Sequence, residues 1–150
     1  MEQLIITADL EEYTIGLNGQ LKLNEFSGFG EAWFNFSEVT TFCKKLSELS
    51  QNMNGSVELI GYQSKPDGSE YLETFSLKCK VLSPSKLNGI VGIQVVLADC
   101  PGSDCRQEEI RTVSGELKVR NHKLNEFSAN LLNLLENSVQ EVSLLGGASI

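Results

Sequence analysis

Apolar and polar residues alternate along several short segments of the chain, and this period of two is typical of β-strands with one buried face. The clearest case runs from residue 71 to residue 81, where the odd positions Tyr71, Phe75, Leu77, Cys79 and Val81 are apolar. Similar patterns and turn residues predict further strands at residues 4–8, 14–17, 21–26, 30–36, 57–62, 90–98, 110–119 and 139–145.

Two other segments carry apolar residues at helical spacing. The first stripe comprises Val39, Phe42, Cys43, Leu46 and Leu49, and Ser37 offers a hydroxyl to cap its helix. The second begins near Asn121 and comprises Leu124, Phe127, Leu131, Leu134 and Leu135. Each stripe predicts an amphipathic helix that buries one side.

Together these patterns predict an α+β fold, with a mostly antiparallel sheet and two amphipathic helices packed on it. The 150 residues are about the size of one ordinary domain, and no interior segment resembles an interdomain linker. We therefore expect a single domain over residues 1–150.

A shift of 85 residues aligns segment 30–61 with segment 115–146 without a gap, and nine of the 32 aligned positions are identical. Three identities lie on the apolar helix stripes and two lie at alternate positions of the strand that follows. This favours an internal strand–helix–strand duplication. The alternative is that amphipathic helices flanked by strands match by coincidence.

The charge of the chain restricts its partners. The sequence has 20 acidic and 12 basic residues, for a net charge of −8, and it lacks a basic run. We therefore expect no nucleic-acid ligand and a basic protein partner instead. Acidic residues concentrate in segments 2–12 and 99–109. The candidate partner-binding residues are Glu11, Glu12, Asp99, Asp104, Glu108 and Glu109.

No apolar run is long enough to span a membrane, and the first residues lack the features of a signal peptide, so we expect a cytoplasmic protein without membrane contact. In a reducing compartment the four cysteines, Cys43, Cys79, Cys100 and Cys105, are expected to be free thiols. Their spacing does not complete a zinc site, and no cofactor motif is present, so we expect neither metal nor cofactor.

The sequence offers little catalytic chemistry. His122 is the only histidine, and it stands at the start of the second predicted helix without a matching nucleophile motif. An aromatic group consists of Phe26, Phe29, Trp33, Phe34 and Phe36. We interpret this group as core, with a ligand-stacking platform as the alternative. A hydrolase would need His122 or paired acids to converge in a cleft.

Segment 26–34, Phe-Ser-Gly-Phe-Gly-Glu-Ala-Trp-Phe, precedes a helix with Phe42 and Leu46, and segments 57–59 and 88–95 follow as strands. In this order the chain resembles small bacterial proteins of unknown function that include immunity proteins of the wall-associated-protein type. The resemblance implies a protein that binds and blocks a toxin domain and that has no catalytic residues. We thus expect a non-enzymatic protein-binding domain, an immunity protein against a basic toxin. The alternative is a small-ligand-binding or regulatory module, and the sequence does not set the oligomeric state.

Overall fold

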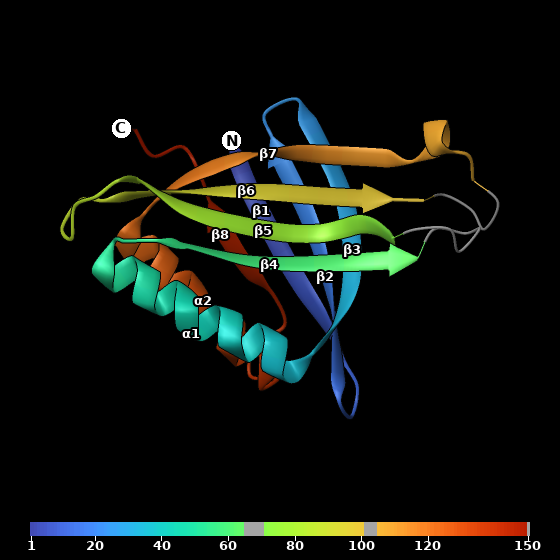
Figure 1. Cartoon of the computed structure of the whole chain (residues 1–150), viewed down its shortest axis with the longest axis horizontal. Helices are drawn as coiled ribbons and strands as arrows, with labels where there is room; N and C mark the ends of the chain where they lie inside the picture. The colour runs from blue at the N-terminus through green and yellow to red at the C-terminus, as the bar shows by residue number, and fades with distance from the viewer. Residues whose placement is uncertain (65–70, 101–104, 150) are drawn as a thin grey trace.

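Two antiparallel four-stranded sheets and two helices make up the computed structural model, which describes residues 1–64, 71–100 and 105–149 (Figure 1). The elements are β1 (Glu2–Leu10), β2 (Thr14–Leu23), β3 (Phe26–Asn35), α1 (Phe36–Asn52), β4 (Ser56–Ser64), β5 (Tyr71–Ser83), β6 (Ile90–Asp99), η1 (Gln107–Glu109), β7 (Arg111–Arg120), α2 (Asn121–Leu135) and β8 (Val142–Leu145). Sheet A has the strand order β3-β2-β1-β8, and sheet B has the order β4-β5-β6-β7. The α+β prediction is confirmed, with two sheets in place of one.

The strands of the two sheets cross steeply in Figure 1, and their inner faces contribute to one hydrophobic core. The alternation in the sequence explains these inner faces: Leu4 and Ile6 of β1 and Phe75 and Leu77 of β5 are all fully buried. The two strands predicted at residues 14–17 and 21–26 are joined into β2, which pairs with β1 and β3 along its whole length. Backbone hydrogen bonds to β1 and β3 on both sides thus keep residues 18–20, which lie between the two predicted strands, in the extended conformation.

The helices α1 and α2 lie side by side against one side of the crossed sheets (Figure 1). The two predicted stripes are confirmed: Phe42 of α1 and Phe127 of α2 are each 2% exposed. A polar contact also joins the helices, because the Ser47 hydroxyl donates to Oδ1 of Asn125 at 3.1 Å. Neither helix in the described ranges is long and apolar enough to cross a membrane.

The start of α1 differs from the prediction. Asn35 is the N-cap in place of Ser37, and its backbone N–H donates to the Glu38 carboxylate at 3.1 Å. Glu38, the third residue of the helix, therefore accepts a hydrogen bond from the Asn35 N–H, a backbone donor that has no partner within the helix.

The two sheets come into direct backbone contact at Gly30 of β3. A Cβ atom at this position would lie 2.9 Å from the Ala98 nitrogen and 3.0 Å from Cα of Leu97, and it would also meet the Thr74 carbonyl oxygen. These neighbours belong to β5 and β6 of the other sheet. A glycine is therefore required where β3 crosses sheet B.

The strand–helix–strand units occur at the predicted offset of 85 residues. Adding 85 to the bounds of β3 (26–35) gives the bounds of β7 (111–120), and α1 and α2 begin at equivalent positions. In both units the strand before the helix forms the edge of one sheet, and the strand after the helix joins the opposite sheet. The chain therefore contains a structural repeat whose two copies exchange their last strands.

Candidate functional site

The two acidic stretches lie at separate ends of the molecule. Glu11 and Glu12 are in the turn between β1 and β2 of sheet A, whereas Asp99 is the last residue of β6 in sheet B, and Glu108 and Glu109 belong to the connection between β6 and β7. In Figure 1 these connections are far apart, the first at the bottom and the second at the right. The acidic residues therefore do not form a single surface.

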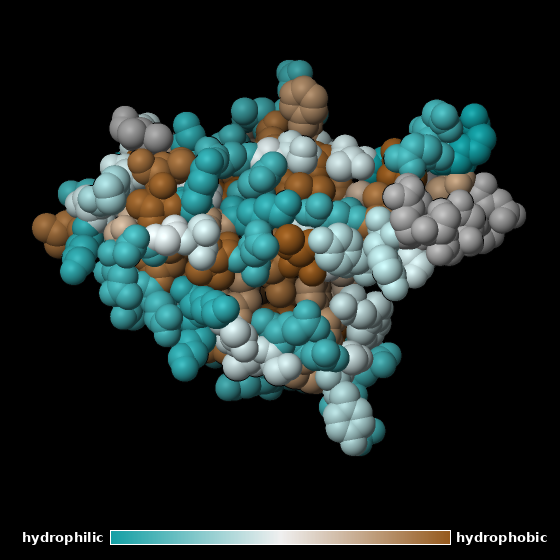
Figure 2. Space-filling model, viewed as in Figure 1, coloured by the Kyte–Doolittle hydropathy of each residue, from teal (hydrophilic) through white to brown (hydrophobic). Residues whose placement is uncertain are grey.

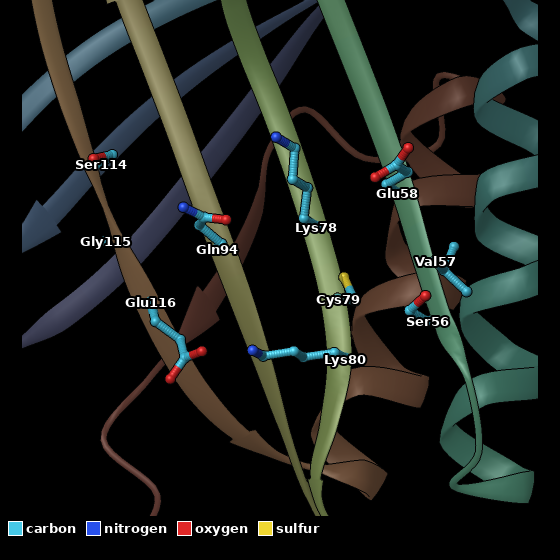
Figure 3. A pocket seen from close by; sticks show the side chains of 10 residues that line it. All are labelled: Ser56, Val57, Glu58, Lys78, Cys79, Lys80, Gln94, Ser114, Gly115 and Glu116. Atoms are coloured by element: carbon cyan, nitrogen blue, oxygen red, sulfur yellow. The ribbon is translucent and has the colours of Figure 1, made fainter.

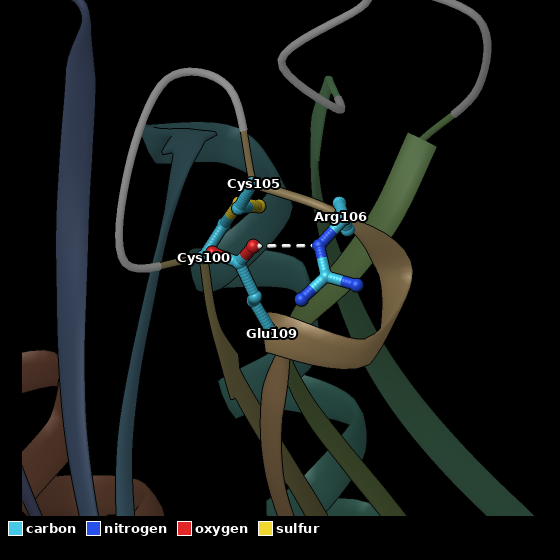
Figure 4. Close-up of a disulfide and its surroundings, with 4 residues drawn as sticks. All are labelled: Cys100, Cys105, Arg106 and Glu109. Carbon is cyan, nitrogen blue, oxygen red and sulfur yellow. Dashed lines mark hydrogen bonds and ion pairs between the residues drawn. A yellow bond between two sulfur atoms is a disulfide. The ribbon is translucent and has the colours of Figure 1, made fainter.

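The acidic residues between β6 and β7 are also partly neutralised. Nε of Arg106 lies 3.1 Å from the Glu109 carboxylate (Figure 4), and an Arg106 guanidinium nitrogen lies 3.9 Å from Glu108. Asp99 stands opposite Arg111 in the register of β6 and β7. Asp104 lies outside the described residues. This connection is thus a weak candidate for attracting a cationic partner.

The prediction of four free thiols is wrong for Cys100 and Cys105, which form a disulfide with a Cα–Cα distance of 6.4 Å (Figure 4). The prediction relied on a reducing compartment, and five-residue spacing in a loop did not reveal that the two side chains meet. Cys43 and Cys79 are free and buried, and burial raises the pKa of each thiol to about 12.

A shallow depression of about 430 Å³ lies on the outer face of sheet B (Figure 3). Polar side chains from all four strands line it, among them Glu58, Lys78, Lys80, Gln94 and Glu116. Figure 2 shows this side of the molecule, where hydrophilic side chains lie over sheet B beside a smaller hydrophobic area. Its lining offers hydrogen-bond donors and acceptors to a small polar ligand.

The charges in this depression are balanced. Lys80 extends from β5 toward β7, where the Glu116 carboxylate lies over Gly92, and Lys78 is paired with Glu73 at 3.4 Å (Figure 3). Cys79 is also among the residues that line the depression, but its side chain is buried in the core, and a thiol with a pKa of about 12 stays protonated at neutral pH and is a poor nucleophile.

The only histidine does not join this depression. His122 is exposed on the first turn of α2, and it is absent from the residues that line the depression. The convergence of His122 and acids that a hydrolase requires is therefore not seen in this depression.

The outer face of sheet A has a different character, and we call it the aromatic face. It carries Phe29 and Trp33 of β3, which are 49% and 47% exposed, together with half-buried Ile5 of β1 and exposed Leu145 of β8. The register aligns these residues on the side of the sheet opposite the core. The described residues thus place two large aromatic rings on an unpaired sheet face.

The interpretation of the aromatic group as core is wrong for Phe26, Phe29 and Trp33, because all three are exposed, and correct for Phe34, which is buried. Phe36 is partly buried against the core. The period of two within β3 separates buried Phe34 from exposed Phe29 and Trp33, because even positions face inward and Phe29 and Trp33 are odd. Phe26 has an even number but is exposed at the first position of the strand. The aromatic content of the segment concealed this alternation.

Two acidic residues, Asp9 and Glu31, are on the same face of sheet A as Trp33. Its indole ring lies over Gly16 of β2, where a Cβ atom would be 3.1 Å from the ring, and Gly16 is opposite Asp9 of β1. Nδ2 of Asn18 donates to the Asp9 carboxylate at 3.1 Å. Glu31, two residues before Trp33, points to the same side of β3 and is exposed.

Comparison of the chain with protein-family models, with curated proteins and with solved structures found no significant match. Within residues 1–64, 71–100 and 105–149, no group of three or more potential metal ligands is found. The functional assignment therefore depends on the surfaces described above.

Proposed function

We propose that this chain is a non-enzymatic protein-binding domain and that its aromatic face is the binding surface. The observation that carries the proposal is the pair of half-exposed rings, Trp33 and Phe29, on a sheet whose other face is fully used by the core. Exposed apolar surface of this kind marks interaction sites, and tryptophan is among the residues that contribute most to binding energy at interfaces.

The partner that best fits the resemblance of the sequence is a toxin domain, so we propose an immunity role. Immunity proteins of this type act by covering a toxin, which requires a surface but no catalytic group. An acidic chain with a net charge of −8 also suits a basic partner, because complementary charge accelerates association.

The immunity role is tested by co-expression with the C-terminal domain of a secreted toxin encoded beside this chain. We expect the wild-type chain to restore growth and W33A to restore it poorly, at equal protein levels. Tyr71→Ala is the control, because Tyr71 is also an exposed aromatic residue but lies on sheet B. Growth arrest in the presence of the wild-type chain would contradict the immunity role.

An immunity role also implies a cytoplasmic location, where thiol reductants keep most cysteines reduced. The Cys100–Cys105 disulfide would instead persist in an oxidising compartment. Alkylation of intact cells with a mass-tagged maleimide separates these locations. Labelling of both Cys100 and Cys105 under native conditions would support a cytoplasmic location. Labelling of neither cysteine would support an oxidising compartment.

The alternative function, binding of a small polar ligand, has the depression on sheet B in its favour. Lys78 is already paired with Glu73, and the depression is open to solvent. Ligand sites are usually more enclosed and more apolar, so this function is the weaker proposal.

A further inference from the structure

We infer that the aromatic face receives a cationic side chain of an extended basic protein segment, with the guanidinium or ammonium group over the Trp33 ring. This inference rests on the proposed protein-binding function and specifies the chemistry of the partner. It follows from three features of the described residues: an accessible ring, carboxylates beside it and a contrast between the two sheets.

The first feature is the position of the ring. Trp33 lies over Gly16, which has no side chain to displace the ring, and Trp33 is 47% exposed. A cation near the face of an indole ring is attracted by the negative charge density of that face, and tryptophan is the best of the aromatic residues for this interaction.

The second feature is the pair of carboxylates. Asp9 faces Gly16 across β1 and β2, and cross-strand neighbours lie about 5 Å apart, so its carboxylate is next to the site of the ring. The Asn18 amide donates to one Asp9 carboxylate oxygen, and the Asp9 side chain is exposed. Glu31 is exposed on the other side, and two carboxylates can therefore flank a cation over Trp33.

The third feature is the difference in charge between the outer faces of the sheets. On sheet B the carboxylates Glu58 and Glu116 lie among Lys78, Lys80 and Lys118, so that face has no excess of negative charge. On sheet A the acidic residues near Trp33 continue into the turn that holds Glu11 and Glu12. Charge complementarity thus favours a basic segment on sheet A.

Trp33 is the only tryptophan in the chain, so its fluorescence reports on this position alone. The probe is an oligoarginine peptide that contains no aromatic residue, titrated into the intact protein at low salt. We expect saturable quenching or a spectral shift of Trp33 emission. Oligothymidine and maltoheptaose serve as probes for the two other classes of stacking ligand.

The decisive variants change charge by the same amount at two places. D9N/E31Q removes two carboxylates beside Trp33, and E58Q/E116Q removes two from sheet B. We expect affinity for the peptide to fall about tenfold in the first variant and less than about twofold in the second. A labelled peptide and fluorescence anisotropy extend the test to Trp33→Leu, for which we also expect weaker binding.

Equal losses in both double variants would overturn the inference, because the peptide would then respond only to net charge. Unchanged affinity in Trp33→Leu would overturn it as well, as would quenching by the sugar or the nucleotide but not by the peptide. Cross-linking from the aromatic face to a partner protein would leave the proposed function intact in each of these cases. Failure of this inference and failure of the proposed protein-binding function are therefore distinguishable.

Discussion

Substitution of Gly30 by alanine tests the close contact between the two sheets. Gly30 does not adopt a positive φ, so alanine fits the backbone conformation and would by itself add about 0.4–1 kcal/mol by restricting the unfolded chain. The new methyl group, however, would meet backbone atoms of Thr74, Leu97 and Ala98, which belong to two paired strands. These strands cannot move away without separation of the sheets.

Overpacking of a well-packed core costs about 1–3 kcal/mol, and contact with backbone places G30A at the upper end of this range. After subtraction of the entropic gain, we expect a net loss of about 2 kcal/mol. For a chain of this length, that loss lowers Tm by roughly 4–8 °C.

Gly115 supplies a matched control, because it occupies the equivalent position of the second repeat. A Cβ atom at Gly115 would meet only the end of the Leu23 side chain, which is partly exposed and can rotate away. We expect G115A to remain within about 1 kcal/mol of the wild type. Urea unfolding followed by far-UV circular dichroism gives both values, and equal midpoints for the two variants would refute the reasoning.

Three further predictions concern the core and the cysteines. Phe127→Ala should lower the free energy of unfolding by about 3–5 kcal/mol, measured in urea, because its ring is buried between the helices and the sheets. Replacement of Cys100 and Cys105 by serine should cost about 2 kcal/mol by release of the short loop, and a reductant should have no added effect on this variant. The pKa of Cys43 and of Cys79 is raised from 9.0 to about 12, so the folded protein favours the protonated thiols. The free energy of unfolding therefore has its full value below pH 9 and falls above pH 9 by about 1.4 kcal/mol per pH unit for each thiol. Thermal unfolding between pH 8 and 10.5 measures this decline, which should halve in Cys79→Ala.

The parts of the fold that follow from local periodicity could be predicted from the sequence. Phe42 and Phe127 recur at helical spacing with their neighbours, and tertiary packing buries both as expected. The exchange of β4 and β8 between sheets could not be predicted, because strand partners are chosen by contacts distant in sequence. A β-bulge also changed the side to which one residue points. Tyr71 and Phe75 are both odd-numbered, so the alternation predicts that both are buried, but the register shift after Gly61 lies between them and Tyr71 is exposed.

The candidate site was less predictable than the fold. The distribution of charge along the sequence identifies the two acidic segments. It does not show that they are far apart in space, because that depends on which strand ends lie next to each other in the fold. The segment of Trp33 borders a helix with a strong apolar stripe, and this favours a core position for the ring, whereas its actual position on an outer face follows from strand alternation. The disulfide between Cys100 and Cys105 depends on loop geometry that spacing alone does not determine.

The most direct test of the protein-binding claim is site-specific photo-cross-linking in the native cells. A benzophenone amino acid replaces Phe29 on the aromatic face or, as a control, Gln94, which is exposed on the outer face of sheet B. We predict that position 29 captures one discrete protein, that position 94 does not, and that W33A abolishes the product at position 29. The same products from both positions, or none from position 29, would contradict the claim.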